Sequence, residues 1–278
     1  MARMDGKVAF ITGAAGGMGR THATRLADDG CDIIAVDIGR QLEDVPYAMP
    51  AADKLEETAQ LVRERGRRAV TVTADIRDTA ALEAAVRHGV AELGRLDVVV
   101  ANAGIWTLGG NLWEIPEERF REMIEINLTS QWRTVKATIP VMLELGNGGS
   151  VIFIGSTNSF KAVPGNGHYT AAKHGVIGIM RTLAQELAAQ GIRVNAVCPT
   201  GVNTDMLIND RMFQLFRPDL DDPGYEDAEE GLRGLNLIPV PTVEPEDVSD
   251  AVAWLASSES RMVTGSAIAV DAGNLARP

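Results

Sequence analysis

Short apolar runs recur along this chain and alternate with longer stretches in which apolar positions repeat every three to four residues. Short runs of this kind are typical of buried strands, and the longer spacing is typical of amphipathic helices. We predict strands at Lys7–Thr12, Asp32–Val36, Ala69–Ala74, Leu96–Ala101, Gly149–Ile154, Ile192–Cys198 and Ala267–Val270. We predict helices at Arg20–Asp29, Ala51–Arg67, Thr79–Leu93, Pro116–Leu145, Gly165–Gln190 and Glu244–Ala256.

Strands that alternate with helices at intervals of about 30 residues favour a parallel sheet with helices on both faces. Neither a repeat nor a shift in composition marks a domain boundary. We therefore expect an α/β fold, with residues 1–278 forming one Rossmann-type, doubly wound domain around a seven-stranded parallel sheet. Two segments depart from the pattern. The loop at 38–53 is longer than the usual connection of about 2–6 residues, and the irregular segment at about 202–234 is expected to be a substrate lid.

The composition of the chain argues against several kinds of partner and site. A net charge of -12 argues against nucleic acid or an anionic membrane as the main partner. No apolar run approaches the roughly 18 residues of a transmembrane helix, and the N-terminal residues carry no signal-peptide pattern, so we expect a cytoplasmic protein. Cys31 and Cys198 lie far apart, which indicates neither a disulfide framework nor a metal cluster.

The first strand runs into a glycine-rich turn, Gly13-Ala-Ala-Gly-Gly-Met-Gly19, and then into a helix. This order opens a dinucleotide-binding unit, because glycines allow close approach to a pyrophosphate and the helix N-terminus offers free N–H groups. A glycine-rich surface turn is the plainer alternative. Asp37 ends the second strand, where a carboxylate can accept hydrogen bonds from both ribose hydroxyls of NAD and would repel a 2′-phosphate. We expect NAD, although the nearby Arg40 tempers that preference.

Other polar residues follow strand ends or interrupt apolar series. Asp75 follows the third strand, where a carboxylate suits a contact with adenine. The fourth strand runs into Asn102-Ala103-Gly104, whose small residues would permit close packing on a cofactor. Asn127 interrupts the apolar positions of a predicted helix, and it is either a satisfied core amide or part of a proton relay.

Tyr169 and Lys173 are four residues apart in a segment that we predict to be helical. This spacing places both side chains on one helical face. A phenol with a pKa near 10 is a poor base at neutral pH, but a neighbouring ammonium favours the phenolate and lowers that pKa. The pair is therefore a candidate proton-transfer device, whereas an isolated pair of this kind is more often a surface tyrosine over a lysine stem. His168, beside Tyr169, is expected to be structural.

These motifs occur in one order along the whole chain: the glycine turn from Thr12, then Asn102-Ala103-Gly104, Asn127, Ser156, Tyr169-x-x-x-Lys173 and Pro199-x-Gly201. In this order the chain resembles the short-chain dehydrogenase/reductase family. The separation of thirteen residues between Ser156 and Tyr169 also fits. One departure is small: Ala101 stands where the family often has a first Asn.

The resemblance implies a role for each matching residue. Tyr169 would be the general acid/base, and Lys173 would lower its pKa and bind the nicotinamide ribose. Ser156 would orient the substrate oxygen and stabilise charge on it, and Asn127 would hold a water that links Lys173 to solvent. The implied NAD contacts are Gly13, Gly17, Met18 and Gly19 at the pyrophosphate, Asp37 and Ile38 at the adenosine ribose, Asp75 and Ile76 at adenine, Asn102, Ala103 and Gly104 beside adenosine and ribose, and Val202 and Thr204 at the carboxamide.

The long 38–53 loop resembles the insertion of a subgroup associated with the redox peptide mycofactocin, which includes carveol-dehydrogenase-like enzymes. That resemblance implies that the loop closes over the adenosine half, that bound NAD does not exchange, and that an external redox carrier reoxidises the bound NADH in place. The plainer alternative is a solvated, partly ordered loop in an ordinary exchanging dehydrogenase.

The expected substrate is a small hydrophobic secondary alcohol or its ketone, because the walls near Ser156 and Tyr169 are mostly apolar. We expect these walls to include Ile105, Trp106, Asn158, Phe160, Val163, Pro164 and apolar residues of 205–220, although the latter residues would also suit packing of the lid on the body. Resemblance to the family further implies a homotetramer. Two other functions compete: a catalytically silent nucleotide sensor, and a dehydratase or epimerase on the same scaffold.

Overall fold

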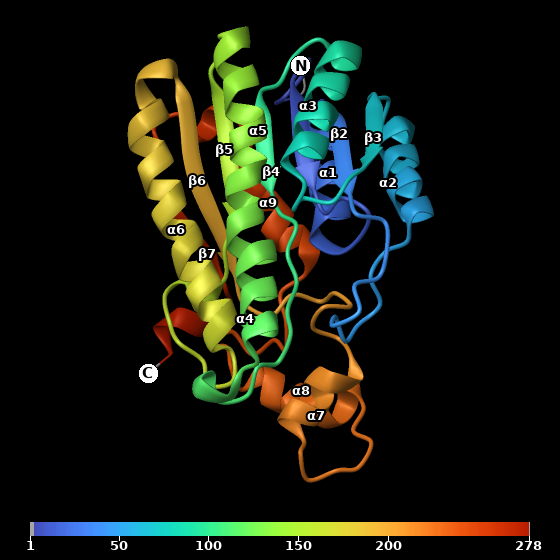
Figure 1. The fold of residues 1–278 in the computed structure, drawn as a ribbon, viewed down its shortest axis with the longest axis vertical. Coiled ribbons are helices and arrows are strands. Elements are labelled where there is room, and N and C mark those ends of the chain that lie inside the picture. The colour runs from blue at the N-terminus through green and yellow to red at the C-terminus, as the bar shows by residue number, and fades with distance from the viewer. Residues whose placement is uncertain (1–2, 278) are drawn as a thin grey trace.

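Seven parallel strands form one sheet in the order β3-β2-β1-β4-β5-β6-β7 (Figure 1). The computed structural model describes residues 3–277. The strands are β1 (Val8–Thr12), β2 (Asp32–Asp37), β3 (Ala69–Thr73), β4 (Val98–Ala101), β5 (Gly149–Ile154), β6 (Ile192–Pro199) and β7 (Ala267–Val270). The order reverses between β1 and β4, and this reversal opens a crevice at the carboxyl ends of the strands, as in other doubly wound sheets. The predicted fold class is confirmed.

Helices cover both faces of this sheet (Figure 1). One face carries α1 (Gly17–Asp28), α2 (Ala52–Glu64) and α9 (Pro245–Ala256), and the other carries α3 (Thr79–Leu93), α5 (Ser130–Leu145) and α6 (Gly167–Leu187). Side chains alternate along each strand, so that Phe10 packs into the core under α3, α5 and α6 while its neighbour Ile11 packs into the core under α1 and α9. Burial on both faces explains why the strands have nearly continuous apolar sequences.

The predicted helix Pro116–Leu145 is not one regular helix. It consists of α4 (Glu117–Ile124), a π-helical turn at Glu125–Thr129, and α5. A π-helical turn accommodates an extra residue without ending the helix, and such turns are frequent at functional sites. Asn127 lies in this turn and is fully buried. The apolar spacing on either side is helical, which is why the interruption is invisible in the pattern.

The segment at 202–234, expected to be irregular, contains two short helices, α7 (Asp210–Phe216) and α8 (Tyr225–Arg233). The side chain of Asn209 accepts a hydrogen bond from Met212 N and so caps α7. Phe213, Ala228 and Leu232 form a small core between the helices. In Figure 1 both helices project from the sheet at the end where the strands finish.

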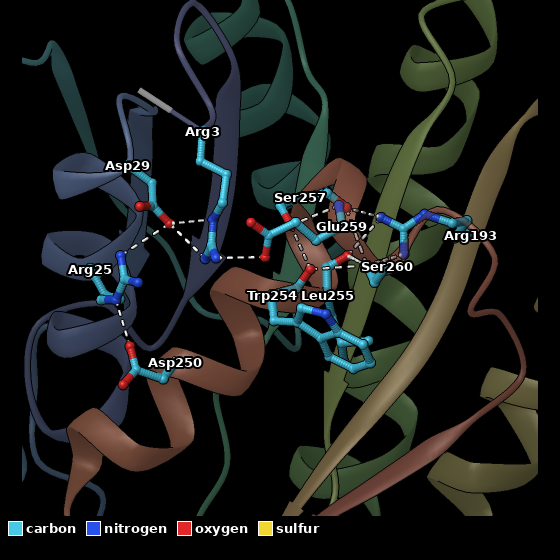
Figure 2. A network of polar contacts seen from close by, with 10 residues as sticks. All are labelled: Arg3, Arg25, Asp29, Arg193, Asp250, Trp254, Leu255, Ser257, Glu259 and Ser260. Atoms are coloured by element: carbon cyan, nitrogen blue, oxygen red, sulfur yellow. Dashed lines mark hydrogen bonds and ion pairs between the residues drawn. The ribbon is translucent and has the colours of Figure 1, made fainter. Parts of the chain in front are cut away.

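A polar network ties several elements together at the opposite end, where the strands begin (Figure 2). Arg3 bonds to Asp29, with Nη2 and Oδ2 2.9 Å apart, and also pairs with Glu259. Arg25 joins Asp29 to Asp250 on α9. The guanidinium of Arg193, at the start of β6, donates to the carbonyls of Leu255 and Ser257 and to the Ser260 hydroxyl. The ends of α1, α9 and β6 are thereby held in register.

No helix within residues 3–277 has the length and apolar character that a membrane span needs. Within the same residues, no group of three or more His, Cys, Asp or Glu side chains is arranged to hold a metal ion.

Candidate active site

The glycine-rich turn lies at the carboxyl end of β1 and continues directly into α1. Gly13 has a φ of +70°, a conformation that favours glycine. At Gly19, already inside α1, a Cβ would overlap the carbonyl oxygen of Gly13. The turn therefore holds the backbone too close for side chains and leaves the first N–H groups of α1 at the surface of a groove, as a pyrophosphate requires.

This groove, which we call the glycine groove, contains most of the predicted cofactor residues. Its lining includes Gly13, Gly17, Met18, Gly19, Asp37, Ile38, Asp75, Ile76, Asn102, Ala103, Gly104 and Thr204. The residues come from the ends of β1, β2, β3 and β4 and from the segment at 202–234, whose role as a lid stays a prediction. A second cavity adjoins it, and the lining residues that the two share are Met18, Asn102, Gly104, Ile105, Thr204 and Met206.

Asp37 is anchored at the end of β2 by backbone N–H groups. Its Oδ2 accepts from Ala15 N at 3.1 Å, and its Oδ1 accepts from Gly39 N at 2.9 Å. Burial raises the pKa of Asp37, and these backbone hydrogen bonds oppose the rise. The carboxylate keeps further acceptor capacity toward the groove, where a diol could donate to it.

Arg40 is already paired with a carboxylate, because its Nη2 lies 3.3 Å from Asp75 Oδ2. Asp75 is also held by Arg77, with Nη2 and Oδ2 2.6 Å apart. Burial raises the pKa of Asp75, but the hydrogen bonds and charge of Arg77, together with the charge of Arg40, outweigh it and leave the pKa below its usual value. Arg40 is thus engaged by a neighbouring carboxylate, which strengthens the preference for a ribose without a phosphate.

Asn102 links the end of β4 to the glycine turn. Its Nδ2 donates to the Thr12 carbonyl at 2.9 Å, and its backbone N donates to Thr12 Oγ1 at 3.1 Å. His22 of α1 lies behind it, fully buried, with its Nδ1 2.8 Å from Ser249 Oγ. Burial lowers the pKa of His22 to about 3, and the neighbouring Asn102 side chain acts in the opposite direction. A neutral histidine therefore supports the floor of the groove.

The predicted catalytic residues meet in the second cavity, which we call the tyrosine cavity. It is lined by Asn127, Ser156, Tyr169, Lys173 and Val202, and its volume is about 420 Å³. Ser156 follows β5, while Tyr169 and Lys173 lie one turn apart on α6. Lys173 Nζ lies 5.6 Å from the centroid of the Tyr169 ring and donates to the Ile154 carbonyl at 2.8 Å.

The ionisation of this pair is dominated by burial. Burial raises the pKa of Tyr169 to about 12, and the adjacent Ser156 hydroxyl acts in the opposite direction. Burial also lowers the pKa of Lys173 to about 8. Burial of the phenol thus shifts the pKa of Tyr169 in the direction opposite to the one that an ammonium alone would give, while Lys173 donates its hydrogen bond to a carbonyl. A lowering of this pKa by Lys173 stays a prediction.

Asn127 is hydrogen-bonded entirely by the protein. Its Oδ1 accepts from Ile105 N at 3.1 Å, and its Nδ2 donates to the Met123 carbonyl at 3.3 Å. This is the pattern of a satisfied core amide. Asn127 nevertheless lines the tyrosine cavity, so its role in a proton relay stays a prediction.

The rest of the tyrosine cavity is largely apolar. Of the predicted walls, Ile105, Trp106, Asn158, Val163 and Pro164 line it, as do Met206, Leu207, Met212, Leu215 and Phe216 of the lid. Phe160 is not among the lining residues and is 42% exposed. Several further wall residues were not predicted from the sequence, namely Lys161, Leu232, Leu235, Asn236, Pro241 and Asn274.

The 38–53 loop is compact and is pinned by one side chain. Gln41 Nε2 donates to the carbonyls of Leu42, Val45 and Tyr47, each at 3.1 Å, and Gln41 Oε1 accepts from Met49 N at 2.9 Å. Leu42 and Val45 are buried in the main core. The loop is therefore packed against the body, unlike the solvated loop that we had kept as an alternative.

This loop also closes one side of the glycine groove. Leu42, Tyr47, Ala48, Met49 and Pro50 line the groove. A Cβ on Gly16 would lie 2.8 Å from Pro50 Cγ, so the loop rests on the glycine turn itself. The nearness of Tyr47 could not be read from sequence, because hydropathy does not show which groove a loop side chain enters.

Known proteins resemble this chain over its full length. The sequence profile of the short chain dehydrogenase family matches residues 7–214. A (-)-trans-carveol dehydrogenase from Rhodococcus erythropolis is 46% identical, over 98% of this chain and 99% of that enzyme. The crystal structure of a carveol dehydrogenase from Mycobacterium avium in complex with NAD is 51% identical and superposes with a TM-score of 0.98, with both chains fully covered. The structure of a short chain dehydrogenase from Mycobacterium paratuberculosis bound to NAD is 44% identical, with a TM-score of 0.89 over 99% of this chain and 100% of that one.

Proposed function

Because this chain belongs to the short-chain dehydrogenase family, we propose that it is an NAD-dependent oxidoreductase that interconverts a small hydrophobic secondary alcohol and its ketone. One observation carries the proposal. The Ser156–Tyr169–Lys173 group lines an apolar cavity that opens into the glycine groove through shared residues. An alcohol held there lies between an acid/base and a nucleotide site.

The glycine groove fits NAD on its own geometry. Backbone N–H groups at the start of α1 suit the pyrophosphate, and Asp37 offers acceptors to the adenosine ribose. Arg40, which could have served a 2′-phosphate, is bonded to Asp75. When bound, NAD would supply the two-electron oxidant for the carbinol carbon.

Three residues of the tyrosine cavity have the remaining roles in the reaction. The Ser156 hydroxyl orients the substrate oxygen and stabilises charge on it. Tyr169 Oη exchanges the alcohol proton, and Lys173 provides positive charge one turn away. Burial works against the phenolate, so we expect proton transfer to depend on the charge that Lys173 retains below a pH of about 8.

We propose that carveol and related cyclic terpenoid alcohols are good candidates for the substrate, because two of the relatives are carveol dehydrogenases. The apolar walls contributed by Trp106, Leu207 and Phe216 suit such a ring. A substrate with several charges would place charged groups against these apolar walls.

We also propose that the nicotinamide cofactor is held without free exchange, and that the NADH formed in alcohol oxidation is reoxidised in place by an external carrier of the mycofactocin kind. The support is the 38–53 loop, which is pinned by Gln41 and rests on the glycine turn. Ligand release from a closed groove requires the loop to open.

The catalytic proposal is tested with Tyr169→Phe. The variant should bind NAD as the wild type does and should lose at least about 1,000-fold in carveol oxidation, since the acid/base is removed. In the wild type, accumulation of the ketone together with NADH that carries at C4 the deuterium of 1-deuterated carveol would exclude a dehydratase or epimerase, because those enzymes return any hydride that they take. A wild type that binds NAD but oxidises none of a panel of secondary alcohols would instead favour a nucleotide sensor.

Retention of the cofactor is tested by denaturing freshly purified, extensively dialysed protein and identifying the released nucleotide by absorbance and mass. Stoichiometric NAD or NADH supports the non-exchanging site. An empty protein that turns over added NAD would show an ordinary exchanging dehydrogenase. Released NADP would contradict the role given to Asp37.

The assembly that we propose is a homotetramer. Trp132 and Leu143 of α5 are each 44% exposed and would be covered by a neighbouring copy. Light scattering coupled to gel filtration gives the mass directly, and a monomer would contradict this assembly.

A further inference from the structure

One side chain of the 38–53 loop joins the glycine groove to the tyrosine cavity. The hydroxyl of Tyr47 accepts the backbone N–H of Trp106, with Oη and N 3.1 Å apart. Tyr47 lines the groove, whereas Trp106 lines the cavity. A single hydrogen bond therefore connects the loop over the cofactor with the wall around the substrate.

Trp106 extends this connection to the catalytic helix. Its indole Nε1 donates to Asn166 Oδ1 at 3.1 Å. Asn166 immediately precedes α6, and its side chain makes no cap hydrogen bond to that helix, so its amide oxygen serves Trp106. Tyr169 is the third residue of α6. The chain of contacts thus ends within one turn of the phenol.

Both hydrogen bonds are partly buried. Trp106 itself is 6% exposed, and burial raises the pKa of Tyr47 further above neutrality, so its hydroxyl stays protonated. A buried N–H that loses its only acceptor shifts the local equilibrium by roughly ten-fold or more. Removing the Tyr47 hydroxyl therefore affects the position of Trp106 and not the loop alone.

We propose that Tyr47 is a positioning residue that couples closure of the 38–53 loop to the shape of the substrate cavity. With the loop closed, Tyr47 fixes Trp106, and Trp106 fixes Asn166 and the first turn of α6. The identity of the two ligands rests on the proposed function, but the contacts do not. Because coupling between binding sites is reciprocal in free energy, a ligand that orders Trp106 also tightens binding of the cofactor.

Hydrogen exchange tests the coupling without any turnover. In Tyr47→Phe, amide exchange should quicken by roughly ten-fold in peptides covering residues 103–109 and 164–170, as well as in the loop. Tyr225→Phe, at the first residue of α8, removes the same hydroxyl elsewhere and should leave these peptides unchanged. Faster exchange confined to residues 38–53 would overturn the proposal.

A double-mutant cycle provides the kinetic test, with carveol as the probe. Tyr47→Phe and Asn166→Ala should each raise KM roughly ten-fold while changing kcat less than about three-fold, because the phenol itself is intact. The double variant should be no worse than either single one. Effects that multiply would show that the two residues act independently, which refutes the coupling. A wild type that is inactive toward carveol would count against the proposed substrate, and the exchange measurement would still decide the coupling.

Discussion

His22 makes the protein sensitive to mild acid, and the size of the effect follows from its surroundings. The ring is fully buried between α1 and α9, and burial lowers its pKa from the ordinary 6.5 to about 3. An unfolded chain binds a proton at His22 below pH 6.5, whereas the folded protein does not until about pH 3. The stability from this group is therefore fully present above pH 6.5 and is lost progressively as the pH falls from 6.5 toward 3.

The magnitude is large for one residue. The difference of about 3.5 pKa units corresponds to about 5 kcal/mol by pH 3, and to about 2 kcal/mol between pH 7 and pH 5. The range from pH 7 to pH 5 is the better one to measure, because most carboxylates titrate at lower pH. His168 is also buried, with a pKa lowered by burial, and adds to the same loss.

Urea unfolding at pH 7, 6 and 5, at a fixed protein concentration, measures this effect. In His22→Asn the fall in the free energy of unfolding between pH 7 and pH 5 should be about 2 kcal/mol smaller than in the wild type. The contribution of His168 is common to both proteins and cancels. His88→Asn, at an exposed position of α3, should fall as the wild type does. Equal slopes for His22→Asn and the wild type would refute the reasoning.

Three further substitutions have defined outcomes. Gly104→Ala places a Cβ 2.6 Å from Asn127 Oδ1 and should lower the free energy of unfolding by about 1–3 kcal/mol. At Gly178 an added Cβ meets nothing within 4 Å, so Gly178→Ala should not destabilise the protein, and thermal unfolding compares the two variants. Asp37→Asn should lower the affinity for NAD roughly 10–100-fold, because the amide of Asn would present an N–H group to one of the two backbone N–H donors that Asp37 now accepts from. Calorimetry measures this affinity, and an unchanged value would contradict the ribose contact. Gln41→Ala removes four hydrogen bonds within the 38–53 loop and should raise the rate of NAD release at least about ten-fold in a chase experiment. Gln60→Ala, on the surface of α2, should leave that rate unchanged.

The strands and the predicted site could be read from the sequence because each depends on local signals. A parallel strand buried on both faces is an apolar run, and the residues that follow it meet at one edge of the sheet. Asp37, Asn102 and Ser156 were placed in this way. Tyr169 and Lys173 share a helical face by their spacing alone.

The remainder depends on contacts between distant segments. The π-helical turn at Glu125–Thr129 alters hydrogen bonding but leaves the apolar spacing in place. Helices α7 and α8 are short and amphipathic, so their stability comes from the core that they share. The pKa of Tyr169 could not be foreseen, because the spacing of four residues says nothing about burial. The bond between Tyr47 and Trp106 joins residues 59 positions apart and leaves no pattern in either segment.

The network in Figure 2 has a consequence for how this scaffold can change. Its members, from Arg3 and Asp29 to Arg193 and Ser260, secure the end of the sheet where the strands begin, and none of those ten residues lines the groove or the cavity. Insertions at the opposite end, such as residues 38–53, therefore leave the anchoring interactions untouched. The chain can acquire a different binding loop by lengthening or recombination while the cost to folding stays local. A designer seeking new specificity could exchange the lid on the same grounds.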